Sequence, residues 1–111
     1  MVEQRLDTTF AALADPTRRG MLARLAEGER SIGELAQPFA MSFAGASKHV
    51  RALEKAGLVE RRKAGRQMLC RLRAEPLREA EAWLRQWEKV WTTSLDRLEA
   101  LLRGDKGEER S

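Results

Sequence analysis

Lysine and arginine residues concentrate between positions 48 and 73 of this 111-residue chain. The segment holds nine of them against only two acids, Glu54 and Glu60, so it carries a net charge of +7, whereas the rest of the chain carries −3. The nine are Lys48, Arg51, Lys55, Arg61, Arg62, Lys63, Arg66, Arg71 and Arg73. Such clustering is typical of a surface that binds phosphate groups. Charge alone leaves a second interpretation equally open, which is a basic surface that is only solvated.

The first part of this segment has the pattern of a helix suited to the major groove of DNA. Ser42 is a suitable N-cap and Gly57 a suitable stop, while Ala46, Val50 and Leu53 share one face. Small side chains on the other face allow close approach, and hydroxyl or cationic groups there can bond bases and phosphates. The candidate DNA-binding residues of this helix, about 42–56, are Ser42, Phe43, Ala44, Gly45, Ser47, Lys48 and Arg51. For Phe43 two roles are open, contact with a thymine methyl group or closure of the core.

The second part of the segment has the pattern of a two-stranded hairpin. Residues 58–63 and 67–72 have strand-like spacing around a turn at Gly65, where a positive φ is expected. The basic hairpin, about 59–72, would lie on the DNA backbone or enter a minor groove. Its candidate contacts are Arg62, Lys63 and Arg66.

Four helices and a hairpin followed by a long helix would position these residues. Asp15-Pro16 starts a second helix, Ser31 and Glu34 form a capping box for a short third one, and Pro38 ends it. Consecutive helices of this kind, the second of them basic, describe a helix-turn-helix. The sequence therefore predicts a mainly α, winged helix-turn-helix fold in the order α-α-α-α-β-β-α. A single domain would span residues 1–103, and a disordered polar tail 104–111.

The last helix, expected from Pro76 to Arg103, carries apolar residues at alternating spacings of three and four. They are Leu77, Ala80, Leu84, Trp87, Trp91, Ser94, Leu98 and Leu101. Such a seam favours a homodimer interface over a tryptophan pocket for a small molecule, which is the alternative. The interface is expected to include Leu6, Phe10, Leu84, Trp87, Trp91 and Leu98.

The single cysteine and the single histidine offer little chemistry. Cys70 alternates with Met68 and Leu72, which favours a small buried side chain over a redox sensor. For His49, packing is favoured over contact with a phosphate. No dispersed glycine forms a phosphate-cradling loop, so no enzyme is expected. One cysteine and no apolar run of membrane-spanning length suggest a cytoplasmic protein.

Several separated motifs resemble the ArsR/SmtB family of bacterial transcriptional regulators. They are Ala14-Asp15-Pro16-Thr17-Arg18, Ser47-Lys48-His49, the segment from Leu53 to Val59, and Gly65-Arg66, and the likeness covers residues 6–100. The resemblance implies a winged-helix dimer that pairs through its first and last helices. It also implies recognition of double-stranded DNA by the helix that starts at Ser42, and repression of the protein's own operon.

Many members of that family sense metals, but this chain departs from their pattern. Its third helix reads Glu34-Leu35-Ala36-Gln37 without cysteine, and its last helix has no histidine. We therefore expect no metal and no cofactor, as in the metal-free branch with a Trp-rich last helix. A protein–protein docking module is the competing class, but such a face rarely needs this density of one charge. The operator and any inducer are not visible in the sequence.

Overall fold

The computed structural model describes the backbone of residues 2–110 and the side chains of residues 4–104. The chain divides into two units, Met1–Ala80 and Glu81–Ser111. The first unit contains the helices α1 (Val2–Leu13), α2 (Pro16–Glu27), α3 (Ile32–Ala36) and α4 (Phe43–Lys55), with a 3-10 turn, η1 (Gln37–Phe39), between α3 and α4. It also contains the strands β1 (Arg30–Ser31), β2 (Val59–Ala64) and β3 (Gln67–Leu72). The last helix, α5 (Glu75–Arg110), starts in the first unit and supplies the second.

Side-chain caps set the starts of α2 and α3, as the sequence predicts. Asp15 accepts hydrogen bonds from the backbone N–H groups of Thr17 and Arg18 at 2.8 and 3.1 Å, and Pro16 occupies the first turn of α2. Ser31 and Glu34 form the reciprocal capping box of α3. Each cap satisfies backbone donors that the first helical turn leaves unpaired, so these helices start at residues fixed by local chemistry.

The sheet has the strand order β1-β3-β2 with both pairs antiparallel. β2 and β3 form the predicted hairpin, in which Arg61 pairs with Cys70 and Lys63 with Met68. Gly65 at its turn has φ +62°, as expected. β1 is an addition to the predicted order, and it places Arg30 opposite Cys70 and Ser31 opposite Leu69. Since Ser31 also caps α3, the hairpin is joined directly to the start of the helix-turn-helix.

The core of the first unit lies among α2, α3, α4 and the sheet. Its fully buried side chains include Met21, Leu35, Val50, Leu53, Leu58 and Cys70. The burial of Cys70 confirms that it packs as a small apolar side chain. Phe39 of η1 packs tightly over Gly20 of α2, where a Cβ atom would lie 2.7 Å from the ring. The core therefore fixes α4 from one side and leaves its other side in solvent.

The end of α5 differs from the expected one. The helix extends to Arg110, past Gly104, instead of ending near Arg103. A glycine raises the free energy of a helix by only about 1 kcal/mol, so it does not stop one by itself. The domain limits and a disordered tail stay predictions. Along the described residues, no helix has both the length and the apolar character needed to cross a membrane.

Candidate nucleic-acid interface

The recognition helix predicted from the sequence is α4, and its two faces differ sharply. Ala46, Val50 and Leu53 are fully buried on one face. The candidate DNA-binding residues on the other side are exposed or half-buried: Ser42, Phe43, Ala44, Lys48 and Arg51 are exposed, and Gly45 and Ser47 are half-buried. The structure therefore places all of these candidates on one accessible surface, at or after the start of α4.

The start of α4 is held by Ser42. Its Oγ accepts a hydrogen bond from the backbone N–H of Gly45 at 3.1 Å. A Cβ atom at Gly45 would lie 3.3 Å from that oxygen, which is close contact. Gly45 thus leaves room for the capping oxygen, a role that sequence reasoning missed. It also lacks a side chain that would keep a partner away from the helix backbone.

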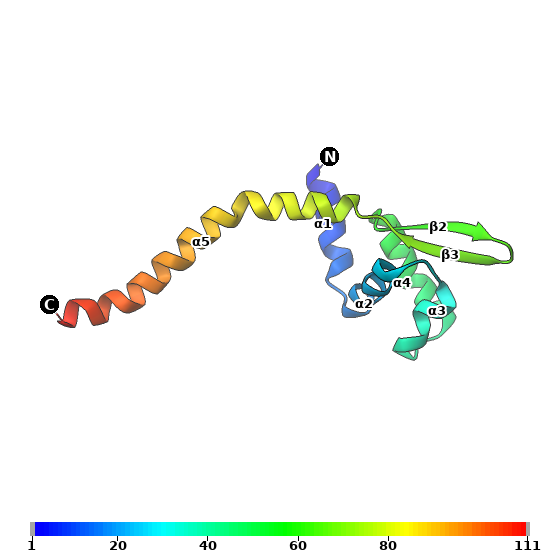
Figure 1. The fold of residues 1–111 in the computed structure, drawn as a ribbon, viewed down its shortest axis with the longest axis horizontal. Coiled ribbons are helices and arrows are strands. Elements are labelled where there is room, and N and C mark those ends of the chain that lie inside the picture. Colours follow the sequence, from blue (N-terminus) through cyan, green and yellow to red (C-terminus); the bar gives the residue numbers. More distant parts are fainter. Residues whose placement is uncertain (1, 111) are drawn as a thin grey trace. The chain divides into compact units, whose positions relative to one another are not determined.

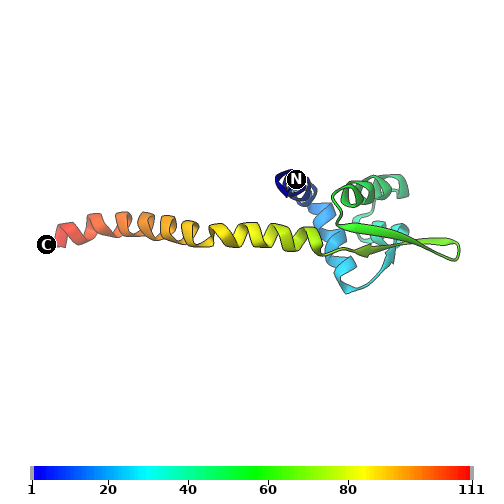
Figure 2. The ribbon, with the colours of Figure 1, turned by 90° about the horizontal axis from the view of Figure 1, so that it is seen from above.

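The hairpin lies next to the helix-turn-helix, and its turn points away from the helices of this unit in both Figure 1 and Figure 2. Lys63 and Arg66 flank the turn, and both are exposed. Neither forms an ion pair with any residue whose side chain the structure describes. Their charges are therefore available to an anionic partner.

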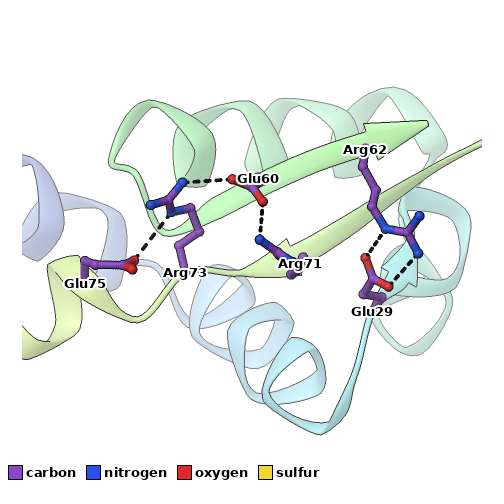
Figure 3. Close-up of polar contacts among 6 residues, drawn as sticks. All are labelled: Glu29, Glu60, Arg62, Arg71, Arg73 and Glu75. Atoms are coloured by element: carbon purple, nitrogen blue, oxygen red, sulfur yellow. Dashed lines mark hydrogen bonds and ion pairs between the residues drawn. The ribbon is translucent and has the colours of Figure 1, made fainter. Parts of the chain in front are cut away.

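Arg62 has a different environment from its neighbour Lys63. Its Nε and Nη2 donate to the two carboxylate oxygens of Glu29 at 2.7 and 2.8 Å (Figure 3). The hydrogen bond from Arg62 holds the pKa of Glu29 below its ordinary value. Glu29 precedes β1, so this two-point contact ties the middle of β2 to the corner between α2 and β1. Arg62 thus forms an ion pair within the protein, and its contact with DNA stays a prediction.

The arginines at the base of the hairpin are also paired with acids. Arg61 lies 2.9 Å from Glu54. Glu60 accepts from both Arg71 and Arg73, at 2.5 and 2.8 Å, as Figure 3 shows. Part of the positive charge of segment 48–73 is thus neutralised at the base of the hairpin. Within the described part of the chain, the basic residues of this segment without an ion pair are Lys48, Arg51, Lys55, Lys63 and Arg66.

These free cations lie in two places, along the exposed side of α4 and at the turn of the hairpin. A cleft of about 450 Å³ separates the two, and Phe43 and Ser47 line it from α4 while Arg66 and Met68 line it from the hairpin. The acidic partners lie against the base and the middle of the hairpin, and Lys63 and Arg66 at its turn have none among the described side chains. The arrangement presents a basic, two-part surface to a phosphate backbone.

His49, Leu6 and Phe10 can also be placed. His49 is half-buried on α4. Leu6, predicted at the dimer interface, is only 5% exposed in the single chain and already packs within it. Phe10 is half-buried. No three His, Cys, Asp or Glu side chains within the described residues gather closely enough to hold a metal ion.

The fold and this surface define a winged helix-turn-helix DNA-binding protein, in which the hairpin is the wing. A family model described as a helix-turn-helix domain matches residues 13–62. The HTH-type transcriptional regulator Rv2034 of Mycobacterium tuberculosis is 36% identical over 89 residues, which are 80% of each chain. The transcriptional repressor SdpR of Bacillus subtilis is 28% identical over 79 residues, 71% of this chain and 88% of that one.

Solved structures agree. The crystal structure of an ArsR family transcriptional regulator has a TM-score of 0.75 and 40% identity, covering 81% of this chain and 93% of that one. A homodimeric winged helix-turn-helix DNA-binding domain from Mycobacterium bovis has a TM-score of 0.60 and 29% identity, covering 86% and 83%. The chain belongs to the ArsR family of transcriptional regulators. Its family and fold are those of DNA-binding regulators of transcription and not of enzymes.

Proposed function

We propose that this regulator is a homodimeric repressor of its own operon. In this proposal α4 enters the major groove, and the turn of the wing contacts the flanking backbone or minor groove. The two α4 helices of a dimer would read a two-fold symmetric operator, with half-sites one helical turn or a multiple of it apart. Because its target would be chromosomal DNA, we propose that the protein acts in the cytoplasm.

The observation that carries the proposal is the division of α4 into a buried and an accessible face. Its buried face is anchored in the core by Ala46, Val50 and Leu53. Its accessible face combines small residues with Ser47, Lys48 and Arg51, and the free cations of the wing turn lie beyond the cleft. Direct readout of base edges needs a helix that is anchored in the core and presents small, polar and basic side chains to the groove.

The homodimer is supported by the exposed apolar stripe of α5. Trp87, Trp91 and Leu98 are 41%, 51% and 54% exposed in the single chain. The other large apolar side chains of the second unit are exposed as well: Trp83, Leu84, Val90, Leu95, Leu101 and Leu102. An apolar stripe of this length favours a partner that covers it. A second copy is the partner we propose, because the relative from M. bovis is described as homodimeric.

Repression follows from the mode of binding. A dimer seated on an operator that overlaps a promoter would obstruct the polymerase, and the related SdpR is named a transcriptional repressor. We propose that the repressed operon is the one that encodes this protein, so that the regulator would control its own concentration.

Fluorescence anisotropy with DNA from upstream of the gene tests the proposal, with a random duplex as control and salt varied from 50 to 200 mM. We expect the upstream duplex to bind more tightly at 150 mM. With roughly 6–10 phosphate contacts, affinity should fall by roughly 10³- to 10⁵-fold across the range. Equal binding to both duplexes at 150 mM would contradict a sequence-specific regulator of its own gene.

Two variants test the surface itself. Arg66→Ala should weaken binding to every duplex and lower the slope of log affinity against log salt by about 1 for each phosphate that the side chain neutralises. Arg71→Ala removes the same charge from the base of the wing, where Glu60 already holds it, and should change the slope little. An equal effect of the two variants would move the DNA contact away from the wing turn.

A further inference from the structure

Phe43 is a large apolar side chain that the fold does not use. It is the first residue of α4 and is 64% exposed, whereas the apolar residues that follow it on the inner face are fully buried. It is not part of the core cluster. Of the two roles that the sequence left open, closure of the core is therefore wrong.

The rest of the first turn of α4 offers little hydrogen-bonding capacity outward. The Ser42 Oγ accepts from the Gly45 N–H, which leaves mainly its own O–H for a partner, and Gly45 has no side chain. Ala44 adds only a methyl group. The N-terminal residues of a recognition helix are those that meet base edges, and the exposed ring of Phe43 favours apolar contact at this turn. The apolar group that a base pair displays in the major groove is the C5-methyl of thymine.

The lining of the cleft beside Phe43 is complementary to a nucleotide, because it combines apolar and cationic side chains. Phe43 lines it from α4, and Met68, which is 42% exposed, lines it from the wing. Arg66 also lines it and has no ion pair with any side chain that the structure describes. A purely apolar protein segment would leave this cation unpaired, whereas a thymidine in a DNA strand supplies both an apolar methyl group and a phosphate. Charge complementarity thus favours DNA as the occupant.

We propose that Phe43 reads the C5-methyl group of a thymine in each half-site, and is thereby a specificity-determining residue of this regulator. This inference rests on the proposed binding of DNA by α4. It adds which base is recognised, by which side chain and through which group.

The test starts with selection of a preferred duplex from a random pool by the full-length protein. Each thymine of that duplex is then replaced in turn by deoxyuridine, which removes the methyl group and keeps base pairing. At one thymine of each half-site, the substitution should weaken binding about fourfold, and about fifteenfold when both half-sites are changed, since one buried methyl group is removed at each.

Variants assign that effect to the side chain. Phe43→Ala should bind more weakly and lose its sensitivity to deoxyuridine at that position. Phe43→Leu should keep part of the sensitivity because it retains an apolar contact. Arg71→Ala shortens a large exposed side chain at the base of the wing, outside the cleft, and should keep the full sensitivity, which makes it the control. Circular dichroism checks that each variant is folded.

The failures are distinguishable. No enrichment of any duplex in the selection would contradict the proposed function itself. An enriched duplex that tolerates removal of every methyl group would overturn the role of Phe43 and leave the function standing. The role of Phe43 would also be overturned if folded Phe43→Ala lost as much affinity as the wild type when deoxyuridine replaces the thymine, or if folded Phe43→Leu did. It would be overturned as well if Phe43→Ala bound every duplex like the wild type, and the cleft would then be left to a small apolar ligand.

Discussion

Neighbouring basic residues of the wing differ in what they can bind, and the difference comes from distant acids. Arg62 is held by Glu29, whereas Lys63 is free of ion pairs with described side chains. Glu29 lies 33 residues away in sequence, so no local pattern reveals the pairing. The charge pattern located the basic segment correctly, but it could not tell which cations the protein itself neutralises.

At Asp15 a residue-level prediction concerns pH. Hydrogen bonds from backbone N–H groups, that of Arg18 foremost, lower the pKa of Asp15 from its ordinary value of 3.8. A carboxylate with a lowered folded-state pKa stabilises the fold above its unfolded pKa, and this contribution is lost as pH falls through the acid range. Asn also caps helices, so Asp15→Asn should fold. Between about pH 5 and pH 3, its melting temperature should fall by less than that of the wild type.

Thermal melts followed by circular dichroism across that range measure this difference. Asp7→Asn, at an exposed position of α1 without a capping role, is the control and should follow the wild type. Parallel pH curves for wild type and Asp15→Asn would show that the charge at this cap contributes nothing.

For secondary-structure elements, the parts that were predictable are those with local signals. The caps at Asp15, Ser31 and Ser42, and the turn at Gly65, lie where the sequence predicts them, because each depends on residues within a few positions. β1 could not be predicted, since two residues have no periodicity and the strand exists only through pairing with β3. The burial of Leu6 is likewise a tertiary effect.

The wing turn provides a test of a single element. Gly65 has φ +62°, and a Cβ atom there would meet nothing within 4 Å, so a side chain at this position costs only backbone strain. Gly65→Ala should lower the free energy of unfolding by about 1–2 kcal/mol, while Gly65→Asn should lose less because Asn tolerates this conformation. Urea unfolding measures both. Equal stability of the two variants would mean that the turn adopts another conformation.

For the whole molecule, the dimer that we propose would pair through the apolar stripe of α5. Trp87→Ala and Trp91→Ala should each weaken a dimer that buries these rings, since truncating a buried aromatic side chain costs about 3–5 kcal/mol. Sedimentation equilibrium at low micromolar concentration should then detect monomer. Thr92→Ala, outside the heptad seam, is the matched control and should leave the mass unchanged. Dimeric mass in both tryptophan variants would place the interface elsewhere.

The buried position of Cys70 has a practical consequence for work with this protein. Burial raises the pKa of its thiol, and the thiolate is the form that reacts with alkylating reagents. Because the chain has no other cysteine, the native protein can be handled as though it had no reactive thiol. A cysteine introduced at an exposed position of the wing, as in Gln67→Cys, would then take up a fluorophore at one defined site, and Cys70 could stay in the core that it helps to fill.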